Sequence, residues 1–229
     1  AGLLRLPPGL GKQGLLQEGL MGNPVSARNE SNWLDITKFN EVTSYIKPLW
    51  KSLKEKGCQG IDADYVDCYY YNCVKGFSQR ELKLHQIRFN TWLAREAHRL
   101  GLAIGLRNCV DLIGQFSEVF DFAVSEECLE FNDCKQYQSF YNQDKAIFAI
   151  EYSIKKDRIT LCSEVSSYKM QVKYKLDRWS NCFPREASLP KTEYYTYTEV
   201  LDLPVIIYKN KENFENTSVN PTNFTKGKI

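Results

Sequence analysis

The chain has 229 residues, 43% of them hydrophobic, and a formal net charge of +2. That length is enough for one sizeable core, and a charge so close to zero excludes the strong field with which proteins attract nucleic acid or anionic membrane surfaces. No run of eighteen apolar residues occurs, so the sequence predicts no membrane-spanning helix. We therefore expect a monomer with one principal domain, whose partners are selected by local sites.

Cysteine usage indicates the compartment. The chain has eight cysteines but only two histidines, and no Cys-x-x-Cys pair occurs. This pattern disfavours zinc and favours disulfides, which are typical of secreted, extracellular proteins. Sequons at Asn29, Asn216 and Asn223 agree with secretion and glycosylation. We expect no cofactor and no metal, with an oxygen-only Ca²⁺ or Mg²⁺ site as an alternative.

Short apolar runs alternate with helical patterns along the middle of the chain, which predicts parallel strands joined by helical crossovers. We expect a barrel-type catalytic domain over 32–182, preceded by an irregular segment, 1–31. A partly disordered C-terminal extension, 183–229, follows and contains two β-prone runs. The six expected strands are Trp33–Ile36, Ile61–Asp64, Leu102–Leu106, Phe120–Val124, Ala146–Ile150 and Met170–Tyr174.

Polar residues end nearly every expected strand. They are Asp35, then Asp62, Asp64 and Asp67, then Arg107 and Asn108, then Glu126 and Glu127, then Glu151 and Tyr152. Period-two alternation gives Asp62 and Asp64 the same face of their strand. In a TIM barrel all carboxyl ends meet at one rim, and no glycine-rich phosphate loop supports a nucleotide-binding open sheet instead. We therefore predict an α/β fold, a (β/α)8 TIM barrel incomplete at its N-terminus, although some acids could simply cap helices or pair with Arg107.

Five segments in the expected order resemble glycoside hydrolase family 114, whose members are TIM-barrel endo-α-1,4-polygalactosaminidases. The resemblance runs from about Trp33 to Cys182. It is carried by the segments Gly57–Tyr69, Ala97–Leu102, Gly105–Asn108, Phe120–Cys128 and Ile150–Tyr152. It implies a glycosidase that cleaves α-1,4-linked galactosamine polymers.

The resemblance also implies catalytic residues. Asp64 matches the Asp of the family's Pro-Asp-Asn motif, and Glu126 matches the Glu of its Glu-x-Cys motif. By analogy with related barrels, Asp64 is the expected nucleophile and Glu126 the expected acid/base of a retaining mechanism, in which the two carboxylates stand roughly 5–5.5 Å apart. The adjacent Glu127 is the alternative proton donor.

Further residues are expected to bind the substrate, a cationic amino-sugar polysaccharide that concentrated negative charge would attract. They are Asp35, Asp62, Asp67, Arg107, Asn108, Glu127, Glu151 and Tyr152. Cys128 and Cys134 match a cysteine pair of the family, and Cys162 and Cys182 are expected to bridge around the last strand. The pairing of the other four cysteines stays open, with Cys73 to Cys109 as one arrangement that would join two rim loops.

The chain departs from the family in two respects. The family's first two strands have no counterpart in this sequence, so the sequence is either a fragment or a degenerate barrel. Near the expected nucleophile, Gln59, Asp62, Ala63, Tyr65 and Cys68 stand where the family usually has Asp, Glu, Pro, Asn and Gly, and Arg107 replaces Lys. Displacements of about 1 Å in an active site cost about a hundredfold in rate. The alternative function is therefore a catalytically inactive carbohydrate-binding member of the family.

Overall fold

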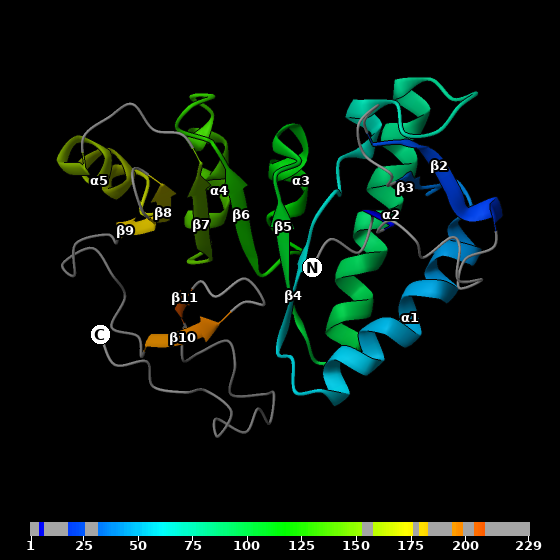
Figure 1. The fold of residues 1–229 in the computed structure, drawn as a ribbon, viewed down its shortest axis with the longest axis horizontal. Coiled ribbons are helices and arrows are strands. Elements are labelled where there is room, and N and C mark those ends of the chain that lie inside the picture. Colours follow the sequence, from blue (N-terminus) through cyan, green and yellow to red (C-terminus); the bar gives the residue numbers. More distant parts are fainter. Residues whose placement is uncertain are drawn as a thin grey trace. The chain divides into compact units, whose positions relative to one another are not determined.

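A computed structural model describes residues 5–6, 18–25, 32–152, 158–175, 179–182, 194–198 and 204–208 (Figure 1). The chain divides into two compact units, Ala1–Val124 and Ser125–Ile229. None of the helices in these described ranges is both long enough and apolar enough to cross a membrane.

Parallel strands form the centre of the first unit. They are β4 (Gly60–Ala63), β5 (Ala103–Arg107) and the first three residues of β6 (Phe122–Glu126). The hydrogen-bonded order is β4-β5-β6, and both pairings are parallel. Every second residue of β4 is buried, because Ile61 and Ala63 face the core. Parallel strands with intervening helices confirm the predicted α/β class.

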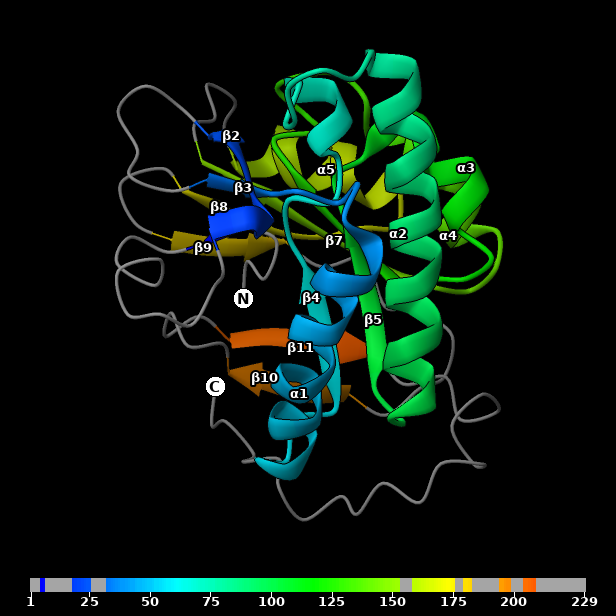
Figure 2. The ribbon, with the colours of Figure 1, turned by 90° about the vertical axis from the view of Figure 1, so that its right-hand side faces the viewer.

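Two long helices, α1 (Phe39–Glu55) and α2 (Gln79–Arg99), pack beside these strands (Figure 2). Val42, Ile46 and Trp50 recur every four residues on α1 and are fully buried, which is the spacing of one helix face. Trp50 stacks on Trp92 of α2 with ring centroids 6.1 Å apart. These buried contacts hold both helices against the sheet.

The ends of α2 follow from its sequence. Ser78 Oγ accepts a hydrogen bond from the Glu81 amide at 3.3 Å, and the Glu81 carboxylate accepts one from the Ser78 amide at 2.8 Å. This is a capping box, the N-terminal motif expected of a Ser-x-x-Glu sequence. Gly101, with φ of +66°, ends the helix in a left-handed conformation that suits glycine.

Shorter helical elements accompany α2 in the crossover from β4 to β5 and form the crossover from β5 to β6. After β4 comes a 3₁₀ turn, η3 (Cys68–Tyr71), and after β5 come η4 (Val110–Leu112) and the single-turn helix α3 (Ile113–Phe116).

An antiparallel sheet corrects two expectations about the N-terminal part. The segment 1–31 was expected to be irregular, yet it contains β1 (Arg5–Leu6), a 3₁₀ turn η2 (Glu18–Leu20) and β2 (Met21–Pro24). The strand expected at Trp33 is present as β3 (Asn32–Leu34), but it pairs antiparallel with both β1 and β2 instead of joining the parallel strands. An apolar run of this length carries no signal for the partner it will pair with.

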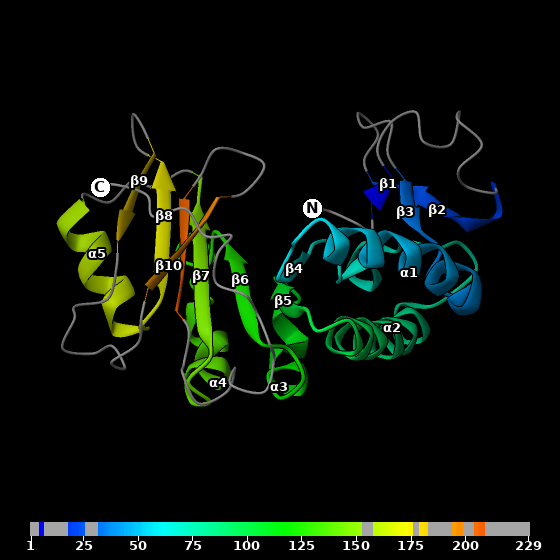
Figure 3. The ribbon, with the colours of Figure 1, turned by 90° about the horizontal axis from the view of Figure 1, so that it is seen from below.

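The second unit continues with the end of β6, then β7 (Ala146–Glu151), β8 (Gln171–Lys175) and β9 (Trp179–Cys182), in that order. β8 is parallel to β7 and β9 antiparallel to β8. Three helical elements connect them: η5 (Cys134–Tyr137), α4 (Gln138–Tyr141), which packs against β7, and α5 (Arg158–Ser167) (Figure 3). The two β-prone runs of the extension pair with each other, as β10 (Tyr194–Thr198) and β11 (Pro204–Tyr208).

Candidate active site

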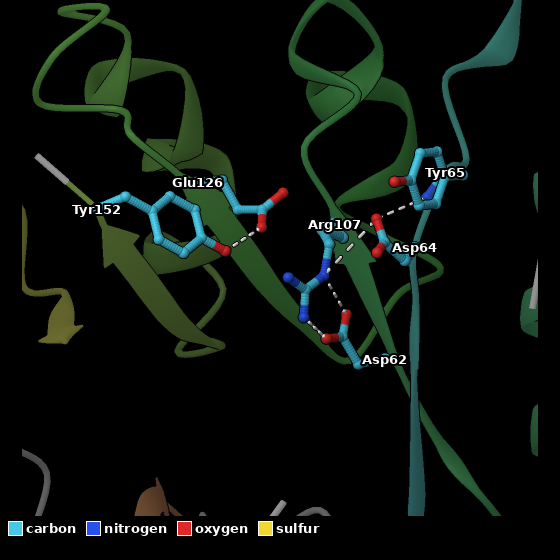
Figure 4. Close-up of polar contacts among 6 residues, drawn as sticks. All are labelled: Asp62, Asp64, Tyr65, Arg107, Glu126 and Tyr152. Carbon is cyan, nitrogen blue, oxygen red and sulfur yellow. Dashed lines mark hydrogen bonds and ion pairs between the residues drawn. The ribbon is translucent and has the colours of Figure 1, made fainter. Parts of the chain in front are cut away.

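Two acids and an arginine meet at the carboxyl ends of β4 and β5 in the first unit (Figure 4). Arg107 forms an ion pair with Asp62, with its Nε 3.3 Å from Asp62 Oδ1, and the same nitrogen is 4.0 Å from Asp64 Oδ1. Both acids therefore point to the same side, as their spacing predicts, Asp62 from within β4 and Asp64 from the residue that follows it. The Asp62 and Arg107 side chains are only 16% and 11% exposed, whereas Asp64 is 30% exposed. Of the two acids, Asp64 is the more accessible to a ligand.

Glycine 105 makes room for this arrangement. It lies opposite Asp62 in the β4–β5 register, and a Cβ at this position would collide with the Phe122 ring of β6. The glycine thus permits the ring to lie across β5 on the face of Asp62 and Arg107.

A second pair of polar side chains lies in the second unit, at the ends of β6 and β7. The Tyr152 hydroxyl donates a hydrogen bond to Glu126 Oε1 at 2.6 Å (Figure 4). This bond fixes the orientation of the Glu126 carboxylate. The Glu127 backbone amide donates a hydrogen bond to the Ile150 carbonyl at 2.8 Å, and the φ of Glu127 is +60°. The chain therefore turns immediately after Glu126.

Glu151 is more deeply placed than the sequence suggests. Its side chain is fully buried, and Oε1 accepts a hydrogen bond from the Leu129 amide at 3.0 Å. The pKa of Glu151 is raised to about 7, mainly by burial and also by the charges of Glu127 and Asp133, while the hydrogen bonds from the Leu129 and Glu130 backbone oppose the shift. The sequence predicted that Glu151 binds the substrate. A side chain without solvent exposure is better suited to hold the loop after β6 in place.

Among the other predicted substrate-binding residues, Asp35 makes a local hydrogen bond with its side chain, and Asp67 and Asn108 make hydrogen bonds with their backbones. Asp35 is 7% exposed and accepts a hydrogen bond from the Thr37 amide at 3.1 Å, so it closes a local turn after β3. It was expected to end a strand of the parallel sheet, which is wrong because β3 belongs to the antiparallel one. The Asp67 carbonyl accepts from Tyr70 at 2.9 Å, and the Asn108 amide donates to Val124 at 2.8 Å.

Comparison with protein families identifies the chain. A family model described as glycoside-hydrolase family GH114 matches residues 11–187, well over half of the sequence. The chain belongs to glycoside hydrolase family GH114. The match includes the acid groups of both units, and family membership makes the protein a glycosidase.

Solved structures share the fold of this GH114 chain. Aspergillus fumigatus Ega3, solved as a complex with galactosamine, aligns with a TM-score of 0.67 and 22% identity over 80% of this chain and 76% of its own. The glycoside hydrolase domain of PelA from Pseudomonas aeruginosa gives a TM-score of 0.59 and 12% identity over 77% and 76%. A comparison with curated proteins finds no match. The fold is thus the α/β barrel of these hydrolases, of which the described strands form part.

Sequence reasoning noted Tyr65 only as a departure from the family and assigned it no role. Tyr65 follows Asp64, donates its amide to Asp64 Oδ1 at 2.8 Å and has a φ of +59°. A left-handed conformation is uncommon for tyrosine, whereas asparagine tolerates it well. The family resemblance places Asn at this position, so that substitution was the signal for a tight turn behind Asp64.

The disulfides settle part of the open cysteine pairing. Cys128 and Cys134, the pair implied by the family, are bonded, and so are Cys68 and Cys73. The arrangement that joins Cys73 to Cys109 is therefore wrong, and Cys109 is a buried free thiol. Cys162 is disulfide-bonded. The side chain of its expected partner Cys182 lies outside the described residues, as do the sequons at Asn29, Asn216 and Asn223.

Among the residues that the structure describes, no three or more His, Cys, Asp or Glu side chains are grouped so that they could hold a metal ion.

Arg107→Gln is expected to lower the free energy of unfolding by about 3 kcal/mol, because removal of one partner leaves Asp62 nearly buried and uncompensated. Urea denaturation measures the change. Lys51→Gln, in a pair with Glu55 whose side chains are 72% and 65% exposed, is the matched control and should cost less than about 0.5 kcal/mol. An additional Asp62→Asn should restore part of the loss, and equal effects of Arg107→Gln and the control would contradict the expectation.

Glu151→Gln is expected to change how stability depends on pH. The folded state holds a proton on Glu151 up to about pH 7, whereas the unfolded state releases it near the ordinary pKa of 4.5. Wild-type stability therefore falls as the pH rises through this window and stays lower above it. The free energy of unfolding of Glu151→Gln, relative to that of wild type, should therefore increase between pH 4.5 and 7 by up to about 3 kcal/mol.

Urea denaturation of wild type and Glu151→Gln at pH 5 and pH 8 measures this difference. Glu118→Gln, a change at an exposed carboxylate, is the control. A difference between Glu151→Gln and wild type that is the same at both pH values would contradict the expectation.

Proposed function

We propose that this GH114 member is an extracellular enzyme that hydrolyses α-1,4-linked galactosamine polymers with Asp64 and Glu126 as its two carboxylates. The observation that carries the proposal is the contact of Arg107 with Asp62 and Asp64, at strand ends of a chain that belongs to a glycosidase family. It supports a used site, because Asp64 lies partly exposed at the strand end while Arg107 pairs with the more buried Asp62.

In the proposed mechanism Asp64 attacks the anomeric carbon while Glu126 gives a proton to the leaving oxygen. Glu126 then takes a proton from the water that releases the covalent sugar from Asp64. The partial exposure of Asp64 suits an attacking group, and the hydrogen bond from Tyr152 suits a carboxylate whose orientation must be fixed. Arg107 offsets part of the negative charge of Asp62 beside Asp64.

The proposed substrate is a cationic polysaccharide. Deacetylated galactosamine carries a protonated amine, and acids at the strand ends would raise its local concentration. In the first unit these are Asp62, Asp64 and Asp67, and in the second Glu126 and Glu127. The complex of Ega3 with galactosamine supports the same class of ligand. The disulfides Cys68–Cys73 and Cys128–Cys134 support secretion, since such bonds persist in oxidising compartments.

The test is release of new reducing ends from partly deacetylated α-1,4-galactosamine polymer by the purified protein. We expect release from this polymer and little from the fully N-acetylated form, with the α-anomer as first product if configuration is retained. The second candidate, a binding protein without activity, is favoured by Tyr65 in the left-handed conformation where the family usually has Asn. Polymer binding without release would establish that candidate instead.

A further inference from the structure

The loop after β4 presents two large aromatic side chains to solvent. Tyr70 and Tyr71 are 67% and 59% exposed, whereas their neighbour Tyr69 is buried and donates a hydrogen bond to Asp111. Adjacent exposed rings give up the free energy that burial would provide, so a pair of them is a candidate binding surface.

These rings belong to a continuous aromatic series that begins next to Asp64. Tyr71 lies nearly parallel to Trp33, with centroids 5.5 Å apart and an interplanar angle of 19°, and Tyr70 meets Tyr71 edge-on at 5.6 Å. Trp33 also contacts Tyr65, with centroids 5.3 Å apart in a T-shaped arrangement. Trp33 is only 2% exposed, so it serves as a fixed base rather than as a contact surface.

The loop that carries the rings is held rigidly. A disulfide joins Cys68 to Cys73, and the Cys68 amide donates to the buried side chain of Gln86 at 3.0 Å. Asn23 of β2 donates its amide to the Cys73 carbonyl at 2.7 Å and its side chain to the Asn72 carbonyl at 2.6 Å. Because the rings are already ordered, the protein loses little conformational entropy when a ligand stacks on them.

We propose that Tyr70 and Tyr71, backed by Trp33, form an aromatic platform that binds an additional sugar of a cationic polysaccharide beside Asp64. The proposal rests on the function proposed above. The apolar C–H face of a sugar ring packs on an aromatic face, and a protonated amine is attracted to the same face. Asp67, which directly precedes η3, adds negative charge at the base of this loop. These features favour an amino sugar over a neutral one.

The test measures binding by calorimetry, with partly deacetylated α-1,4-galactosamine hexamers and with Asp64→Asn as the background, so that the ligand is not cleaved. We expect Tyr71→Ala and Tyr70→Ala each to raise Kd about tenfold and Tyr71→Phe, which keeps the ring, to leave it within about twofold. Leu84→Ala, at an exposed apolar position on α2, is the control and should leave Kd unchanged. Thermal melting of each variant verifies that it is folded.

The outcomes separate this proposal from the proposed function. If the wild type releases no reducing ends but Tyr71→Ala still weakens hexamer binding, the hydrolase fails and the platform stands. If the hexamer binds equally to Tyr71→Ala, Tyr70→Ala and Leu84→Ala, or binds to none of the proteins including the background variant, the platform is overturned. In an active wild-type background, Tyr71→Ala should raise KM for the polymer about tenfold and leave kcat within about twofold.

Discussion

Asp64→Asn is expected to lower kcat on α-1,4-galactosamine polymer by about 10⁴-fold or more, the scale found when an enzyme loses its nucleophile. Asparagine has nearly the same shape and its side-chain oxygen can still accept the Tyr65 amide, which is 2.8 Å away in the wild type. The variant should therefore stay folded and lose only the attacking oxygen. Initial rates of reducing-end release, with a thermal melt of the same sample, measure both quantities.

Asp144→Asn is the matched control for this substitution. Asp144 is exposed and has a φ of +54°, a conformation that asparagine also tolerates, so its replacement should change neither rate nor stability. If Asp64→Asn keeps more than about a tenth of the wild-type rate, Asp64 is not the nucleophile. Asp62→Asn then becomes the next variant to assay, since Asp62 shares the same face of β4.

Glu126→Gln is expected to reduce hydrolysis of the polymer by about 10²- to 10⁴-fold, which is the contribution of a general acid. For a galactosaminide with a nitrophenolate leaving group, the loss of rate in the first step, formation of the covalent sugar, should be smaller, because nitrophenolate departs without a proton. Added azide should then accelerate turnover, since it attacks the covalent sugar without needing a general base. Burst kinetics and identification of the glycosyl azide measure these steps.

Glu127→Gln decides between the two adjacent carboxylates. Glu127 contributes a backbone bond to Ile150, and Glu126 is the one that accepts the Tyr152 hydroxyl, so Glu127→Gln should keep most of the activity. The reverse result, a large loss and azide rescue in Glu127→Gln but not in Glu126→Gln, would assign the proton donor to Glu127.

Several features of the fold and site could be predicted because they depend on near neighbours in the sequence. Alternation along β4 placed Asp62 and Asp64 on one face, and the spacing of Ser78 and Glu81 predicted the cap of α2. The pairing of an acid with Arg107 was also foreseen as an alternative to substrate binding.

Other features depend on partners that lie far away along the chain. The antiparallel pairing of β3 needs β1 and β2, which show no periodic signal. The bond of Cys68 to Cys73 is an exception, because these cysteines are only five residues apart, yet eight cysteines permit too many pairings for sequence to choose. The full burial of Glu151 depends on the loop after β6, which covers a strand end that looked open in the sequence.

The sequence by itself determined the family, the α/β class and which acids end which strands, because these properties are written in local period, spacing and motif. Only the tertiary structure decided what each acid contacts. Asp62 forms an ion pair with Arg107, Glu126 is oriented by Tyr152, and Glu151 is buried beneath a loop. The physical reason is that a side chain's partners and its exposure to water are set by packing between distant segments, whereas its place on a strand is set by the strand alone.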